Sequence, residues 1–214
     1  MRLAPTEVTP QVEEYMLGLL APRDPVLTRI EAVIESGDTP GIGPHVGRLL
    51  ALLLRLNRAQ DVLELGTASG YSAIWLARGS SGGVTTLEAD PARARRARAN
   101  IAEAGLEDRI EVLEVEAMQH LERSGGTVDA IFNDLLNSFP DEATVERCLE
   151  LSLARLRPGG LLLADNALGR GRVVAPESRQ ARNIDRYNRL IAAEPRLESI
   201  IVPIRDGVSV ARLA

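Results

Sequence analysis

The sequence predicts an α/β fold, in which helices cover both faces of a doubly wound, mostly parallel sheet of seven strands. Between residues 61 and 164, short apolar runs alternate with helical patterns, as in consecutive β-α-β units. These runs are continuously apolar, which indicates burial on both faces. The last two strand patterns, 197–204 and 207–213, are separated only by Arg205 and Asp206, and so short a connection predicts an antiparallel hairpin.

The predicted elements follow one another without a linker, so we expect the 214 residues to form a single domain. Residues 1–37 are predicted to form a helical cap, with helices over 9–20 and 24–36. Residues 38–214 are predicted to form the core. Its strands before the hairpin are predicted at 61–65, 84–88, 110–115, 128–132 and 160–164. Its helices are predicted at 45–56, 70–79, 91–105, a short segment ending at Leu121, 141–156 and 178–193.

The composition excludes several classes of function. A net charge of −5 and only 3% aromatic residues argue against binding to nucleic acid or to an anionic membrane surface. All 25 basic residues are arginine, which excludes lysine-dependent catalysis and a lysine-containing phosphate loop. With a single cysteine and no long apolar segment, we expect a cytoplasmic protein.

A glycine-containing loop follows the first predicted strand, in the segment ELGTASGYS (64–72). Gly66 allows a sharp turn, Gly70 allows the backbone to approach a ligand, and the N-terminus of the next helix favours a carboxylate. Glu88 ends the following strand, about 20 residues later, where an acid can bind ribose hydroxyls. Together these features favour an adenosine-type ligand, although an ordinary tight turn remains an alternative. The glycine spacing is not that of NAD enzymes.

Acidic and amide side chains end two further strands, at Asp134 and at Asp165–Asn166. Because ligands bind at the carboxyl ends of strands in such sheets, we expect these three side chains to converge. Two carboxylates and an amide oxygen suit Mg²⁺. The alternative is that they are polar strand ends bonded to neighbouring loops.

Four segments carry a resemblance to a known family: ELGTASGYS, LEADP (87–91), RPGGLLLADNALGRGRV (157–173) and DGVSVARL (206–213). They resemble class I S-adenosylmethionine-dependent methyltransferases, and among these the cation-dependent O-methyltransferases typified by catechol and caffeoyl-CoA O-methyltransferases. The resemblance implies a Rossmann-like fold, a homodimer, S-adenosylmethionine and Mg²⁺ as cofactors, and a small phenolic or catechol-like acceptor.

The resemblance also implies a role for individual residues. Asp134, Asp165 and Asn166 would hold the metal. The cofactor would be bound by Gly41, Ile42, Glu64, Gly66, Gly70, Ser72, Glu88, Ala117, Met118 and Asp134.

The catalytic residues are less clearly defined. Asn137 stands where the family has a lysine that assists deprotonation of the acceptor, and an amide cannot take up that proton. Four alternatives therefore remain open. The metal alone activates the acceptor, another residue acts as the base, the protein only binds S-adenosylmethionine, or the acceptor is a different kind of molecule. His45 is a candidate for a substrate role. Arg179, Arg182, Arg186 and Arg189 share one helix face that could attract an anionic substrate, although a solvated face is the more ordinary interpretation.

Overall fold

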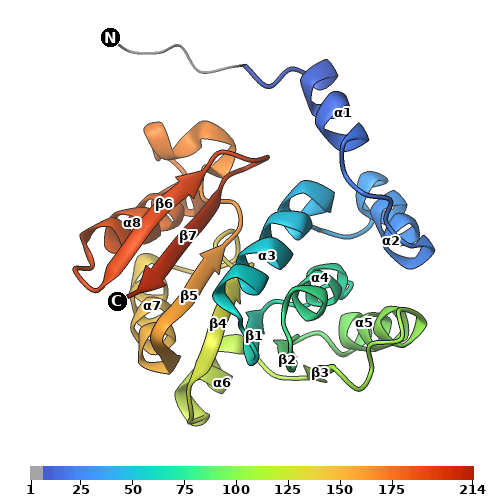
Figure 1. Ribbon diagram of the computed structural model, residues 1–214. Coiled ribbons are helices and arrows are strands. Elements are labelled where there is room, and N and C mark those ends of the chain that lie inside the picture. The colour runs from blue at the N-terminus through green and yellow to red at the C-terminus, as the bar shows by residue number, and fades with distance from the viewer. Residues whose placement is uncertain (1–6) are drawn as a thin grey trace.

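The fold is built on one sheet of seven strands in the order β3-β2-β1-β4-β5-β7-β6 (Figure 1). This computed structural model describes residues 7–214, so residues 1–6 of the predicted cap lie outside the described part. Strands β1 to β5 pair in parallel, whereas β7 pairs antiparallel with both β5 and β6. The predicted fold class, including the antiparallel C-terminal pair, is confirmed.

The strands are β1 (Val62–Leu65), β2 (Val84–Leu87), β3 (Ile110–Leu113), β4 (Val128–Asn133), β5 (Leu156–Ala164), β6 (Leu197–Val202) and β7 (Val208–Leu213). The helices are α1 (Pro10–Gly18), α2 (Pro25–Glu35), α3 (Gly43–Asn57), α4 (Tyr71–Gly79), α5 (Pro91–Glu103), α6 (Ala117–Arg123), α7 (Glu142–Arg155), α8 (Arg179–Ala193) and a 3₁₀ helix, η1 (Gly169–Val174).

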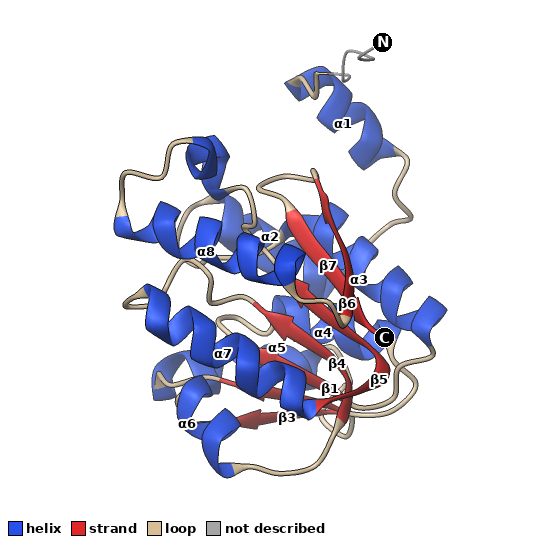
Figure 2. Ribbon diagram, turned by 90° about the vertical axis from the view of Figure 1, so that its left-hand side faces the viewer, coloured by secondary structure: helices blue, strands red, loops and turns tan. Residues whose placement is uncertain are grey.

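Helices cover both faces of the sheet, and each face has its own core (Figure 2). Helices α3, α4 and α5 pack on one face, while α6, α7 and α8 pack on the other. Successive side chains of β4 alternate between the two cores, since Phe132 lies in the first and Ile131 in the second. This arrangement explains why β4 is apolar at consecutive positions from Ala130 to Phe132.

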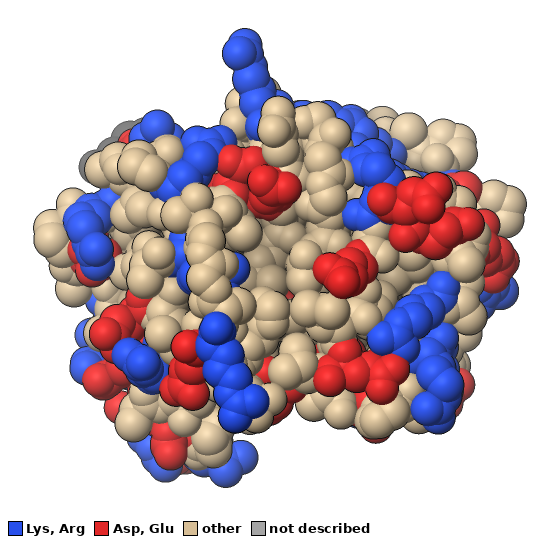
Figure 3. Space-filling model, turned by 90° about the horizontal axis from the view of Figure 1, so that it is seen from below, with Lys and Arg blue, Asp and Glu red and all other residues tan. Residues whose placement is uncertain are grey.

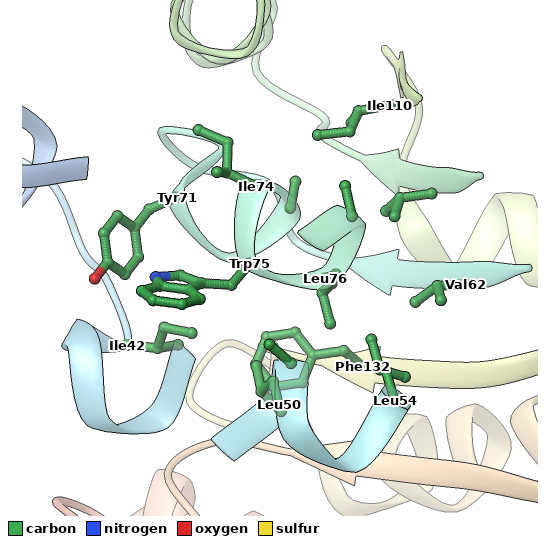
Figure 4. Close-up of a cluster of buried hydrophobic side chains, with 14 of the residues drawn as sticks. Ile42, Leu50, Leu54, Val62, Tyr71, Ile74, Trp75, Leu76, Ile110 and Phe132 are labelled. Carbon is green, nitrogen blue, oxygen red and sulfur yellow. The ribbon is translucent and has the colours of Figure 1, made fainter. Parts of the chain in front are cut away.

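The cap is tied to the glycine loop through Tyr71, the first residue of α4. Its ring meets Trp75 edge-on, with the ring centroids 6.4 Å apart (Figure 4). Its hydroxyl donates to Oε1 of Glu31 in α2 over 2.6 Å, and Arg23 Nε donates to both oxygens of the same carboxylate. Glu31 is buried, so its charge depends on these two donors. The network fixes α2 against the start of α4.

The two cap helices pack differently. Helix α2 buries Val26, Leu27 and Ile30 against the core. Helix α1 buries no residue, and Figure 1 shows it standing away from the sheet. Tyr15 and Leu19 are each 68% exposed. None of the helices in residues 7–214 has the length and apolar character needed to cross a membrane.

Three elements differ from the sequence prediction. Strand β5 begins at Leu156, not at residue 160, because Leu156 pairs with Val128 and a bulge takes up the segment before Leu161. The segment 203–207, rather than two residues, joins β6 to β7. The segment Gly169–Val174, which has no periodic pattern in the sequence, forms the 3₁₀ helix η1.

The end of the molecule where the parallel strands begin carries no patch of a single charge. Figure 3 shows arginine and acidic side chains interspersed there around a hollow.

Candidate active site

The candidate site lies at the carboxyl ends of the parallel strands, and the loop between β1 and α4 forms one side of it. Gly66 and Gly70 have φ values of 98° and 80°, in the left-handed region that favours glycine. A Cβ atom at Gly70 would lie 3.3 Å from Cβ of Ala97 in α5. Glycine at position 70 therefore serves the turn and the packing against α5, while its role in the approach of a ligand stays a prediction.

Glu64 is a buried carboxylate with one oxygen still unpaired. Oε2 accepts a hydrogen bond from the Thr86 hydroxyl over 2.5 Å, whereas Oε1 has no hydrogen-bond partner among the described residues. Burial raises the pKa of Glu64 to about 7, although the hydroxyls of Ser72 and Thr86 act against this rise. An unpaired, buried carboxylate oxygen is costly, so this position is suited to a cationic donor from a ligand.

Glu88 is held rigidly at the end of β2. Its Oε2 accepts from the backbone N–H of Ala68 over 2.9 Å, and its Oε1 accepts from the backbone N–H of Asp90 over 3.0 Å. A carboxylate offers about four acceptor positions, so two remain for other donors. Ala68 belongs to the glycine loop, and the first bond therefore links that loop to the predicted ribose acid.

Asp134, Asp165 and Asn166 line one cleft of about 760 Å³, as the sequence predicted. Burial raises the pKa of Asp134 well above its usual value, and the neighbouring carboxylates of Asp165 and Glu64 add to the rise. Burial also raises the pKa of Asp165 to about 6, while the Arg205 guanidinium opposes that rise. Oδ1 of Asp165 is buried and has no hydrogen-bond partner among residues 7–214.

These atoms fit a divalent cation of the magnesium type. The donors are hard oxygens, they carry closely spaced negative charge, and one of them is an orphaned buried oxygen. In the described part of the chain, no three His, Cys, Asp or Glu side chains gather as a metal site. A cation here therefore needs the Asn166 amide oxygen as well as solvent or substrate oxygens.

Asn137 lines the same cleft but is placed to orient its neighbours. Its Nδ2 donates to Oδ1 of Asn166, and its Oδ1 accepts from Nε2 of Gln180 over 2.7 Å. Gln180 in turn accepts from Arg172 Nη2 over 3.2 Å. Hydrogen bonds thus run without a break from Arg172 through Gln180, Asn137 and Asn166 to the Asp165 carboxylate.

Most of the other residues predicted to bind the cofactor do not line this cleft. Gly41 lines it, whereas the Ile42 side chain is buried in the hydrophobic core. Ser72 is buried in the first turn of α4. Ala117 and Met118 begin α6, and the Glu116 carboxylate caps that helix by accepting from Gln119 N–H over 2.8 Å.

His45 does not line the cleft that holds Asp134. It lines an adjoining cavity together with Gly43, Pro44 and Arg205. Its Nε2 atom is buried and has no hydrogen-bond partner in the described structure.

Sequence reasoning missed the basic and amide residues of the cleft. Arg170, Arg172, Gln180 and Arg205 all line it. Arg170 and Arg172 come from η1 and Arg205 from the β6–β7 turn, where the sequence has no periodic pattern, whereas Gln180 lies in the first turn of the predicted helix α8. These residues follow soon after strand ends or helix starts that face the site. That position is the signal in the sequence that could have identified them.

The strand order, the acidic residue after β2 and the acidic cleft beyond β4 and β5 define a methyltransferase of small molecules. The O-methyltransferase family model matches residues 28–214, and the chain belongs to this family. The predicted resemblance and the predicted enzyme class, an S-adenosylmethionine-dependent O-methyltransferase, are confirmed.

Relatives with known names or structures agree with this assignment. The chain is 30% identical to the catechol O-methyltransferase of Niastella koreensis, over 96% of this chain and 97% of that protein. It is 34% identical to an O-methyltransferase from Bacillus cereus solved in complex with SAH, with a TM-score of 0.82 over 95% of this chain and 97% of that one. It is also similar to an O-methyltransferase of Streptomyces achromogenes involved in tomaymycin synthesis, at 27% identity and a TM-score of 0.81 over 96% of that chain and 95% of this one.

The raised pKa of Glu64 predicts a pH-dependent loss of stability. Its folded-state value of about 7 exceeds the value of 4.5 expected when unfolded, so the free energy of unfolding should fall as pH rises between these values. Glu64→Gln removes that penalty. Urea denaturation should show a gain of roughly 2–4 kcal/mol at pH 8 and little gain at pH 4.5. The exposed Glu111→Gln is the control. An equal gain at both pH values would contradict a raised pKa for Glu64.

Proposed function

We propose that this protein transfers the methyl group of S-adenosylmethionine to one hydroxyl of a small vicinal diol, with Mg²⁺ bound in the acceptor cleft. The observation that carries the proposal is the convergence of Asp134, Asp165 and Asn166 from two adjacent strand ends into one cleft. The 30% identity to a catechol O-methyltransferase supports a catechol-like acceptor.

The residues around the glycine loop account for the methyl donor. The unpaired Oε1 of Glu64 would accept from the methionine ammonium group. The free N–H groups at the start of α4, with Ser72, would bind the methionine carboxylate. Glu88 has two acceptor positions left for the ribose hydroxyls, and Ala117 and Met118 would border the adenine. The relatives solved with SAH and SAM support this assignment.

The cleft residues account for activation of the acceptor. Asp134, Asp165 and Asn166 would hold the cation, which when bound lowers the pKa of the acceptor hydroxyls. Asn137 neither takes nor gives a proton. It donates to the Asn166 amide oxygen and so fixes the direction in which that oxygen points. Asn137 is thus a positioning residue, and the proposal assigns it no role as a base.

A different acceptor is the second candidate, and one observation favours it. No Phe, Tyr or Trp side chain is among the described residues that line the cleft. A bare aromatic ring would therefore find no stacking partner.

The cap and the oligomeric state belong to the same proposal. We treat residues 38–214 as the cofactor-binding core and residues 1–37 as its cap. Glu13 of α1 and Ile34 of α2 line the cleft, which supports a cap that closes over it. Tyr15 of α1 and Leu19, the residue after that helix, are exposed apolar residues that a second copy of the chain would cover.

Methyl transfer from S-adenosylmethionine to a panel of catechols and phenols, with Mg²⁺ or with a chelator, tests the reaction. We expect turnover on catechols that a chelator abolishes and Mg²⁺ restores. Asp165→Asn should lower turnover at least about a hundredfold, because it removes one of two ligand charges. Asp108→Asn, an exposed residue outside the cleft, is the matched control. Turnover that survives chelation would contradict the metal assignment. No turnover on any acceptor would favour a protein that only binds the cofactor.

Glu88→Ala tests the donor site. Hydrogen bonds to a charged group contribute about 1.5–3 kcal/mol each, so the dissociation constant for S-adenosylmethionine should rise at least tenfold. Titration calorimetry measures this, with the exposed Glu107→Ala as control. Because Glu88 also holds Ala68, Glu88→Gln should be measured beside it. An unchanged dissociation constant in both Glu88 variants would refute the ribose role.

Light scattering tests the proposed homodimer. At micromolar concentration the mass should be twice the 23.1 kDa of one chain. Tyr15→Glu combined with Leu19→Glu should shift the protein to the monomer, because charges would then occupy the buried interface. A monomer in the unmodified protein would count against the dimer and leave the fold untouched.

A further inference from the structure

Three arginines line the acceptor cleft and none of them has a carboxylate partner. Arg170, Arg172 and Arg205 all belong to its lining, yet no acidic group lies within 4 Å of any of these guanidinium groups in residues 7–214. Guanidinium groups that share one cleft repel each other unless an anion neutralises them.

The arginines elsewhere that looked suited to an anion are already used. On α8, Arg186 pairs with Glu146 and Arg189 pairs with Asp185. Arg182 donates to the backbone carbonyl of Glu177. The face that the sequence suggested is therefore largely satisfied within the protein, whereas the cleft arginines are not.

Two of the three cleft arginines, although exposed to solvent, are oriented by hydrogen bonds of their side chains. Arg172 Nε donates to the Gly169 carbonyl over 3.0 Å, and its Nη2 donates to Gln180 over 3.2 Å. Arg205 Nη1 donates to the Gly41 carbonyl over 3.3 Å. Neutral partners orient these two side chains, and neither forms an ion pair, although the charge of Arg205 also acts on the Asp165 carboxylate. A ligand would therefore meet a partly pre-arranged site.

Backbone conformation points to the same cleft. Five residues other than glycine have positive φ in the described chain, and three of them, Asn166, Arg170 and Arg205, line this cleft. Each such conformation costs free energy for a residue with a side chain, and such strain gathers at functional sites. The Arg170 turn is held because its N–H donates to the Asp206 carboxylate.

The acidic groups of the lining leave this basic charge available. Asp134 and Asp165 belong to the proposed cation site, and Asp206 accepts the Arg170 backbone N–H. Glu13 lies on the cap side, in α1. The lining residues include no aromatic side chain and are mostly polar or charged, so polar contacts are the main ones offered to an acceptor.

We propose that the acceptor carries an anionic group, a carboxylate or a phosphate, which Arg170, Arg172 and Arg205 bind while its diol lies at Asp134, Asp165 and Asn166. This inference rests on the proposed function. The amide chain of Gln180 and Asn137 links Arg172 to Asn166 and so joins the two ends of the binding site.

Matched acceptors that differ only in charge test the inference. The series is 3,4-dihydroxybenzoate, its neutral amide 3,4-dihydroxybenzamide, 3,4-dihydroxybenzyl phosphate and the cationic 3,4-dihydroxybenzylamine. We expect kcat/KM for the benzoate to exceed that for the benzamide about tenfold at low ionic strength, and the advantage to shrink with added salt. The phosphate and benzoate arms show which anion is preferred.

Arginine variants separate binding of the anion from the intrinsic reactivity of each acceptor. Arg170→Gln and Arg172→Gln should bring the benzoate-to-benzamide ratio to within about twofold of one. Arg172→Glu should favour the benzylamine. Arg179→Gln, one residue before Gln180 but outside the cleft lining, is the control and should keep the ratio of the unmodified protein. A ratio that Arg172→Gln leaves unchanged would overturn the inference.

Dissociation constants keep the inference separate from the proposed function. Calorimetry of the benzoate and the benzamide is measured on the full chain with SAH and Mg²⁺ present. If no acceptor is methylated, the proposed function fails, and tighter binding of the benzoate still supports the anion site. Equal methylation of both acceptors leaves the proposed function standing and overturns the anion site, as do equal dissociation constants.

Discussion

Three carboxylates gathered at the carboxyl ends of β1, β4 and β5 set the main constraint on this structure. Glu64 and Asp165 are buried and Asp134 is half-buried, their charges interact through Asp134, and loss of solvation raises the pKa of each. Water screens them only in part there, so positive charge is needed for all three to be ionised together. Arg205 supplies part of it. A methionine ammonium group and a divalent cation would supply the rest.

This constraint gives a reason for the arrangement of the cap. A cofactor that neutralises buried carboxylates must be enclosed, since exposure to water would weaken every electrostatic contact with it. Tyr71 sits directly after the glycine loop and donates to Glu31 of α2, so the loop and the cap are fixed by one hydrogen-bond network. Arg205 donates to the Gly41 carbonyl and so joins the segment that follows the cap to the β6–β7 turn. The cap and the segment after it are thus each bonded to a part of the core.

The sheet and the acidic residues could be predicted from the sequence, because both leave periodic or positional signals. Continuous apolar runs identified β1 to β5, and the acids after them marked the carboxyl ends where ligands bind. The arginines of the cleft could not be predicted in this way. Arg170 and Arg205 lie in irregular segments whose conformation depends on tertiary bonds such as that from Arg170 N–H to Asp206. The regular spacing on α8 drew attention instead to Arg186 and Arg189, which ion pairs occupy.

Because the chain has no lysine, different groups in this cleft would accept the proton and recognise a negative charge. A lysine near a cation can lose its proton, and so can serve as a base or as a charge but not as both at one pH. Arginine keeps its charge throughout the pH range of enzymes, so Arg172 and Arg205 can attract an anion without taking part in proton transfer. Asn137 has no proton to exchange and holds Asn166 in place. In the proposed mechanism, loss of the acceptor proton therefore depends on the cation site, while recognition of the acceptor depends on guanidinium groups whose charge does not change.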